Sequence, residues 1–212
     1  SSLDADLYAG RIAADGTPRW LASGRAVCIA PGNQTSPRAA SDGQGGAFIL
    51  WTDSRAGGTT DIYVQHIDSL GAVRWAAGGV PACAAAGNQQ NPAMIADGAG
   101  GVIVAWEDGR SGPDIYAQRI DASGTAVWAA NGVPICATPE SQYSPHLVSD
   151  GAGGAIVAWT DFRPGVSNVF AQRVGAAGAS LWTPNGVNVV ATANSQTFGA
   201  MLSDGGGGAF VT

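Results

Sequence analysis

One segment occurs four times in the sequence, and this repetition constrains the fold more than any other feature. The copies contain an Asp-Gly pair at spacings of 55, 53 and 54 residues: Asp42, Asp97, Asp150 and Asp204. Three copies continue into a Trp-x-Asp-x-Arg motif: 51–55, 106–110 and 159–163. A Gln and a second Trp recur at the same period, so the repeat covers nearly all of the 212 residues and indicates a repeat architecture.

One repeat reads as a meander of four strands separated by glycine-rich turns. In the third repeat the predicted strands are 144–150, 155–161, 168–174 and 179–182. The second of these is apolar on both alternating faces, which is typical of a strand covered on both sides. The third carries Gln172 and Arg173, which indicate a more exposed strand.

Sheets stacked face to face cover both sides of their inner strands, and radial stacking gives a β-propeller. We therefore predict an all-β protein: one propeller domain over 1–212, with four-stranded blades and four repeats of about 53 residues per chain. The predicted blades are 36–88, 91–141, 144–195 and one blade split between the termini, 198–212 plus 1–30. Two β-sandwiches are the alternative architecture.

The split blade predicts ring closure, because the chain enters at a third strand and leaves at a second strand. One chain could close on itself as a four-bladed ring, and we favour this closure because it is the simpler one and needs no second copy. Two copies could instead form an eight-bladed ring with two-fold symmetry. A third possibility is a piece of a longer repeat array.

The run "SDGxGG", apolar strand, "AWxDxR", "DIYAQR" resembles the sialidase-like (BNR or Asp-box-like) propeller repeats of secreted bacterial proteins. The strict Asp box, Ser-x-Asp-x-Gly-x-x-Trp, is not matched, because Ser149 adjoins Asp150 and Trp159 follows nine residues later. The resemblance implies a propeller fold and an extracellular or cell-surface location. It carries no catalytic residue across to this chain.

Charge excludes some partners. Only 12% of the residues are charged, the net charge is −6, and no Lys is present. Nucleic acid is excluded because a phosphate-binding surface needs clustered cations. No apolar run is long enough for a membrane span.

Three arginines, Arg55, Arg110 and Arg163, stand once per repeat and could grip a carboxylate. Each follows its own Trp-x-Asp, so we favour a brace for the turn. Glu107 and Glu140 are the only glutamates, and no pair of Tyr and Glu stands out as the nucleophile and base of a sialidase-like site.

Aromatic residues supply the other binding candidates. Trp51, Trp106 and Trp159 end buried strands and are predicted to pack between blades. The second Trp of each repeat lies on an outer strand and could stack on a sugar, although core packing is favoured. These outer residues are Trp20, Trp75, Trp128 and Trp182. Tyr143 and His146 depart from the repeat and could mark a binding spot, although variable loop sequence is favoured.

Cys28, Cys83 and Cys136 share one repeat position with Val190, which predicts a small apolar slot. Equivalent positions in neighbouring blades are too far apart for a disulfide. The Asp-Gly turns carry too few oxygens for calcium and are predicted to be capped by their Asp side chains. We predict no cofactor and no metal.

The sequence therefore favours a non-enzymatic repeat propeller that acts as a binding or scaffolding module. Its predicted partner is a second copy of itself, a glycan or a protein. The alternatives are a sialidase-like or other glycan-processing enzyme, and a fragment or engineered chain made for propeller assembly without a ligand.

Overall fold

The computed structural model describes residues 4–190, 192, 194–196 and 198–212, and these form sixteen β-strands. The first four-stranded sheet contains β3 (Gln34–Ser41), β4 (Ala47–Asp53), β5 (Asp61–Ile67) and β6 (Val80–Cys83). The second contains β7 (Gln89–Ala96), β8 (Val102–Asp108), β9 (Asp114–Ile120) and β10 (Val133–Cys136). The third contains β11 (Gln142–Ser149), β12 (Ala155–Asp161), β13 (Asn168–Val174) and β14 (Val187–Asn188). All pairings are antiparallel.

Two shorter sheets flank these three. One pairs β1 (Leu7–Ala9) with β2 (Arg25–Cys28), and the other pairs β15 (Met201–Ser203) with β16 (Ala209–Val211). The all-β prediction and its repeated four-stranded sheets are thus confirmed. No helix long and apolar enough to cross a membrane occurs in the described residues.

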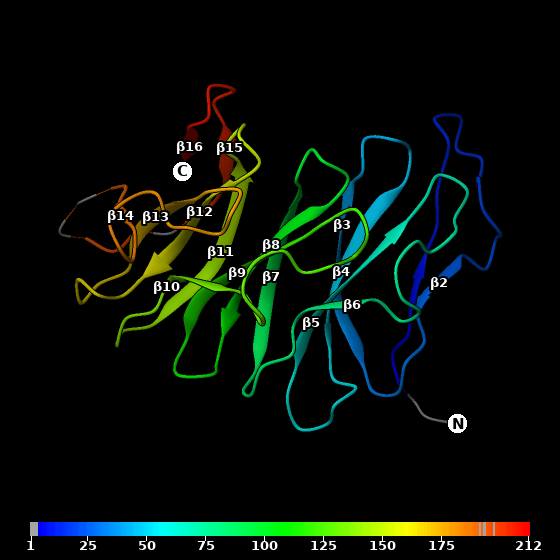
Figure 1. Cartoon of the computed structure of the whole chain (residues 1–212), viewed down its shortest axis with the longest axis horizontal. Coiled ribbons are helices and arrows are strands. Elements are labelled where there is room, and N and C mark those ends of the chain that lie inside the picture. Colours follow the sequence, from blue (N-terminus) through cyan, green and yellow to red (C-terminus); the bar gives the residue numbers. More distant parts are fainter. Residues whose placement is uncertain (1–3, 191, 193, 197) are drawn as a thin grey trace.

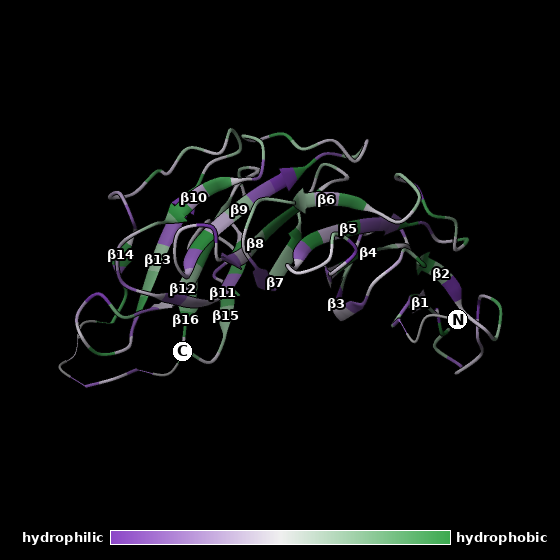
Figure 2. Ribbon diagram, turned by 90° about the horizontal axis from the view of Figure 1, so that it is seen from below, coloured by the Kyte–Doolittle hydropathy of each residue, from purple (hydrophilic) through white to green (hydrophobic). Residues whose placement is uncertain are grey.

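The sheets follow one another along a curved row, with β1–β2 at one end and β15–β16 at the other (Figures 1 and 2). The first strands of successive sheets, β3, β7, β11 and β15, lie on the inner side of the curve and contact one another (Figure 2). Within the described part of the chain the two terminal sheets do not pair, so the single-chain four-bladed ring is not present in this structure.

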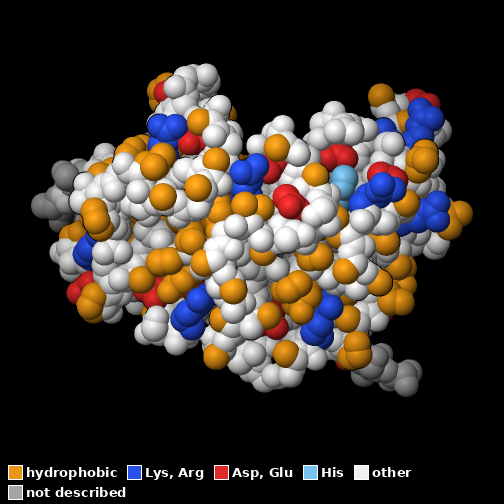
Figure 3. All heavy atoms as spheres, viewed as in Figure 1, with side chains coloured by type: hydrophobic (Ala, Val, Ile, Leu, Met, Phe, Trp, Pro, Cys, Tyr) orange, Lys and Arg blue, Asp and Glu red, His pale blue; other side chains and the backbone are white. Residues whose placement is uncertain are grey.

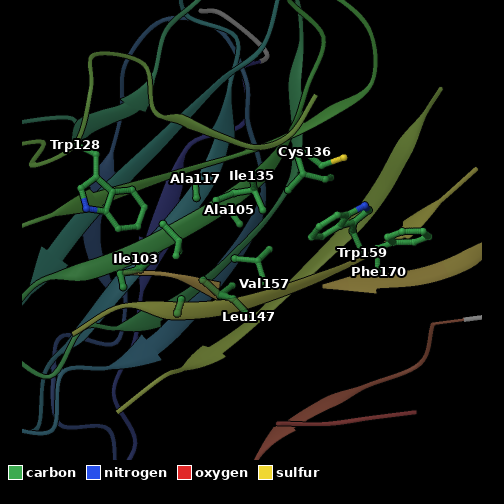
Figure 4. Packing of buried hydrophobic residues seen from close by; sticks show 13 residues of the cluster. Ile103, Ala105, Ala117, Trp128, Ile135, Cys136, Leu147, Val157, Trp159 and Phe170 are labelled. Carbon is green, nitrogen blue, oxygen red and sulfur yellow. The ribbon is translucent and has the colours of Figure 1, made fainter. Parts of the chain in front are cut away.

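The second strand is the most buried one in the second sheet, as its apolar faces predict, whereas in the first and third sheets the third strand is buried to the same extent. Every residue of β8 is buried, because neighbouring strands cover its edges and neighbouring sheets cover its faces. Figure 4 shows this packing, with Ile103 and Ala105 of β8 near Val157 and Leu147 of the third sheet. Hydrophobic burial between sheets therefore holds the row together.

The Asp-Gly turns are capped as predicted. The Oδ1 atom of Asp150 accepts hydrogen bonds from the N–H groups of Ala152 and Gly154, both at 2.8 Å. Its Oδ2 atom accepts from the Arg173 Nε at 2.9 Å. The same carboxylate thus closes the turn and ties it to the third strand.

Two predictions about the strands were wrong. Gln172 is fully buried rather than exposed. The fourth strand is 187–188 rather than 179–182, which makes only the bridge Val174–Ser180. The Gln172 side chain explains both, since its Oε1 accepts from the Trp182 N–H at 3.0 Å and its Nε2 donates to the Thr183 carbonyl at 2.9 Å. The side chain replaces the backbone ladder there and moves the pairing strand further along the chain.

Candidate functional site

The Trp-x-Asp-x-Arg motif forms a compact brace at the end of each second strand. In the third sheet the Trp159 Nε1 donates to the Asp161 Oδ2 at 2.8 Å. The Arg163 Nη2 donates to the same oxygen at 2.6 Å, and its guanidinium lies 4.1 Å from the centroid of the Phe170 ring. Burial alone would raise the pKa of Asp161, but the hydrogen bonds from Arg163 and Trp159 outweigh it and hold the pKa below its ordinary value.

Each of these arginines also reaches the preceding sheet. The Arg163 Nη2 lies 3.3 Å from the Cys136 Sγ, and the corresponding distances are 3.2 Å for Arg55 to Cys28 and 3.4 Å for Arg110 to Cys83. The three arginines therefore stand at separate sheet boundaries instead of converging on one opening. Their hydrogen bonds are those of a structural brace.

The three cysteines are buried and free. Burial raises the pKa of Cys83 to about 11 and that of Cys136 to about 12. The slot is therefore a buried one, as predicted, but it also faces a guanidinium of the next sheet.

The outer tryptophans pack against the next sheet. The Nε1 atoms of Trp20, Trp75 and Trp128 donate to the carbonyls of Ser69, Ala122 and Ala176, at 3.3, 3.1 and 2.9 Å. Trp75 and Trp128 are buried, whereas Trp182 is 38% exposed. Contact between sheets thus occupies the first three of the proposed sugar-stacking side chains.

A candidate site is the cavity of about 380 Å³ on the inner side of the curve, where β3, β7 and β11 come together. Arg38, Ala93 and His146 all line it, and each stands four residues after the repeat Gln of its own sheet. The same repeat position therefore places the guanidinium of Arg38, the methyl group of Ala93 and the imidazole of His146 side by side. The internal symmetry of the chain breaks at this point.

The backbone beside this cavity is strained. Ser36, Asn91 and Ser144 occupy equivalent positions with φ of 53°, 49° and 55°, each at an irregularity of the inner strand. Positive φ in such residues costs about 1–3 kcal/mol each and is concentrated at functional sites. Of these three residues, Asn91 and Ser144 line the cavity itself.

Glu107 holds this strained backbone in place. Its Oε1 accepts from the Asn91 Nδ2 at 2.9 Å and from the Ser144 N–H at 2.7 Å, and its Oε2 accepts from the Gln90 Nε2 at 3.1 Å. Both oxygens of the buried carboxylate are thus engaged.

His146 is half-buried, with its ring centroid 4.6 Å from that of Phe198. Burial lowers the pKa of His146, and the positive charge of Arg38 lowers it further. The imidazole is therefore neutral at pH 7 and offers one donor and one acceptor.

Tyr143 lies apart from His146, on a second cavity of about 290 Å³ that Glu107 also lines. The structure thus brings together a Tyr and a Glu that show no relation in the sequence. The Tyr143 ring packs edge-on against Phe162, with 5.9 Å between the ring centroids. In the described part of the chain, no three His, Cys, Asp or Glu side chains are grouped as metal ligands.

A comparison with known proteins found no family model that matches the chain and no matching curated protein. The site therefore rests on its own geometry. The sequence analysis named His146 as a binding candidate and did not name Arg38, although the presence of Arg and His at the repeat position of Ala93 was a readable signal.

Proposed function

We propose that this chain is a non-enzymatic binding module built from β-propeller blades, with its ligand site in the cavity between β3, β7 and β11. Support for the propeller comes from the curved row of four-stranded sheets, whose first strands gather on the inner side (Figure 2). The resemblance to sialidase-like repeats of secreted proteins supports a place outside the cell or at its surface.

One observation carries the binding site: Arg38 and His146 face the same cavity from equivalent positions on either side of Ala93. The Arg38 Nε donates to the Pro92 carbonyl at 3.1 Å, which anchors the guanidinium at the rim. Among the described residues no acceptor bonds to its two Nη groups. The guanidinium can therefore donate two parallel hydrogen bonds to a carboxylate. The ligand class is therefore an acidic small molecule or an acidic sugar.

A glycan-processing enzyme is the second candidate, because Glu107 and Tyr143 line one cavity. A general base must be within hydrogen-bond reach of the proton that it takes. Both Glu107 oxygens already accept hydrogen bonds from the strained inner strands. This arrangement favours a structural carboxylate, and hence binding without turnover.

An array of acidic and neutral glycans tests the binding site. We expect signal on glycans that carry a carboxylate, and loss of most of that signal in Arg38→Ala and His146→Ala. Arg74→Ala is the matched control, because Arg74 is exposed and lies away from the cavity. Equal binding of neutral glycans, or unchanged binding by Arg38→Ala, would contradict the proposed site.

Turnover of a fluorogenic sialoside separates the two candidates. We expect no turnover above that of buffer at any pH between 4 and 8. Turnover that disappears in both Tyr143→Phe and Glu107→Gln would establish the enzyme instead.

A further inference from the structure

A tryptophan hydrogen bond to a turn carbonyl recurs between successive sheets. At the boundary between the second and third sheets, the Trp128 Nε1 and the Arg119 Nη1 both donate to the Ala176 carbonyl, at 2.9 and 3.4 Å. At the first boundary, the Trp20 Nε1 and the Arg11 Nη1 both donate to the Ser69 carbonyl, at 3.3 and 2.8 Å. At these two boundaries a tryptophan and an arginine clamp one turn carbonyl of the next sheet. Between the first and second sheets His66 stands in place of the arginine, and the Trp75 Nε1 alone donates to the Ala122 carbonyl.

The clamped turn also needs a glycine. A Cβ on Gly178 would lie 2.8 Å from the Trp128 Cγ, and the same holds for Gly124 against Trp75. The indole therefore packs against the turn glycine, where any side chain would collide with it. We call this pair of features, the clamp and its glycine turn, the sheet joint.

The third sheet carries half of a further joint. Trp182 and Arg173 occupy the repeat positions of Trp128 and Arg119. The Arg173 Nε is bonded to Asp150 at 2.9 Å, which sets the guanidinium as in the second sheet. Of the described residues, none accepts from the Trp182 Nε1 or the Arg173 Nη1.

The turn at residues 13–16 is the matching half. The N–H of Gly16 donates to the Ala13 carbonyl at 2.9 Å, as Gly178 does to Gly175 at 2.8 Å. Gly16 has a φ of +85°, and a Cβ built there would meet nothing within 4 Å. Ala14 stands where Ser69 and Ala176 stand, and no donor in the described residues reaches its carbonyl.

The strand edges beside these halves are apolar and exposed. Ile12 is 73% exposed, whereas its equivalents in the complete sheets, Ile67, Ile120 and Val174, are fully buried. Phe210 is 65% exposed, whereas its equivalents are at most 2% exposed: Phe48, Ile103 and Ile156. Large exposed apolar groups of this kind mark an interface.

We infer that two copies of this chain join end to end in a closed ring, each supplying the missing half of the other's joint. Trp182 and Arg173 of one copy clamp the Ala14 carbonyl of the second, and β16 pairs with the second copy's β1. The complete sheets pair Ile156 with Arg173, which places Phe210 opposite Arg11 of the second copy.

A second copy fits better than the same chain, because β1–β2 and β15–β16 lie at opposite ends of the curved row (Figures 1 and 2). A two-fold ring forms two identical joints and leaves only the short outer edges of the blades unpaired. This assembly goes beyond the proposed ligand binding and does not depend on it.

Light scattering coupled to gel filtration tests the ring by mass. We expect twice the 21.2 kDa of one chain for the wild type. Trp182→Ala should raise the dissociation constant of the dimer at least about tenfold, since central tryptophans dominate interfaces. Leu70→Ala is the control, because Leu70 is 78% exposed and belongs to neither half-joint. A wild-type monomer at micromolar concentration would overturn the inference.

A crosslink tests the pairing itself. The variant with Arg11→Cys and Phe210→Cys should oxidise to a covalent species of two chains, while either single substitution should not. Circular dichroism shows whether each variant is folded. A crosslink within one chain would overturn the two-copy ring in favour of single-chain closure, and an open ladder of sizes would overturn the two-fold symmetry.

Discussion

Two buried carboxylates in the first sheet face each other across β4 and β5 and have opposite environments. Asp53 accepts hydrogen bonds from Trp51 and Arg55, which outweigh burial and lower its pKa. Asp61, its cross-strand partner, has its pKa raised by burial and by the charge of Asp53. Identical side chains at neighbouring positions therefore act on stability with opposite signs.

Replacement of each carboxylate by its amide tests this contrast. We expect Asp53→Asn to lower the free energy of unfolding by about 2–3 kcal/mol, because it removes one partner of a largely buried ion pair. Asp61→Asn should cause no loss and should raise stability at pH 7, because it removes an unfavourable charge. Urea unfolding at pH 7 measures both, and a larger loss in Asp61→Asn would contradict the assignment.

The pH dependence of stability follows from the braced carboxylates. Asp53, Asp108 and Asp161 have pKa values below the ordinary value of 3.8 in the folded chain. Their contribution is therefore complete above that value and is lost as the pH falls through the lower folded values. Urea midpoints between pH 2.5 and 6 should fall steeply below about pH 4. The fall should be shallower in Asp108→Asn, which has one fewer such group.

At the scale of the strand, a buried glutamine side chain makes hydrogen bonds to backbone groups that have no partner strand at that point. The Gln118 Oε1 accepts from the Trp128 N–H at 3.0 Å, and its Nε2 donates to the Ala129 carbonyl at 2.8 Å. Gln118→Leu fills the same space but leaves the Trp128 N–H without its acceptor, while the Ala129 carbonyl keeps the hydrogen bond from the Gly132 N–H. We expect a loss of about 1–3 kcal/mol on urea unfolding, and faster hydrogen exchange at the Trp128 amide. Gln44→Leu, in an exposed turn, should leave both quantities unchanged.

The glycine of the sheet joint gives a second test at this scale. Gly124→Ala places a methyl group against the Trp75 indole at a residue with a φ of +84°. Gly98→Ala has the same backbone strain, with a φ of +76°, but meets nothing within 4 Å. The loss of stability in Gly124→Ala should exceed that in Gly98→Ala by about 1–3 kcal/mol. Equal losses would show that the indole yields to the methyl group.

Periodicity made the sheets predictable, because a strand that is apolar on both faces needs neighbours on both. The position of the fourth strand was not predictable by the same rule. Gln172 looks polar and exposed in isolation, and only its two backbone partners explain its burial. Arg38 was not singled out for a related reason: Arg38, Ala93 and His146 are far apart in the sequence and line one cavity only because their strands meet on the inner side of the curve.

At the scale of the whole molecule, charge is spread thinly. The face shown in Figure 3 carries isolated arginines and acidic groups among apolar and neutral side chains, without a broad patch of one sign. Local groups such as Arg38 must therefore supply any attraction to an acidic ligand.

Equivalent joints make whole repeats removable. Deletion of residues 89–141 joins Asn88 to Gln142, which is the repeat equivalent of its natural neighbour Gln89. We expect a folded all-β chain with lower stability, because one set of inter-sheet contacts is gone. Deletion of 89–128 removes only part of a repeat, so the remaining strands no longer follow the repeat order, and it should abolish cooperative unfolding. Circular dichroism and urea unfolding distinguish the two outcomes.

The guanidinium that covers each cysteine has a consequence for redox chemistry. Thiol–disulfide exchange requires a thiolate and access for the attacking molecule, and Cys83 and Cys136 provide neither at neutral pH. The folded chain can therefore meet oxidised glutathione without forming mixed disulfides at these two sites. Any exchange should begin at Cys28, which borders an open cavity of about 390 Å³. The sheet row thus shields two of its own thiols without pairing them.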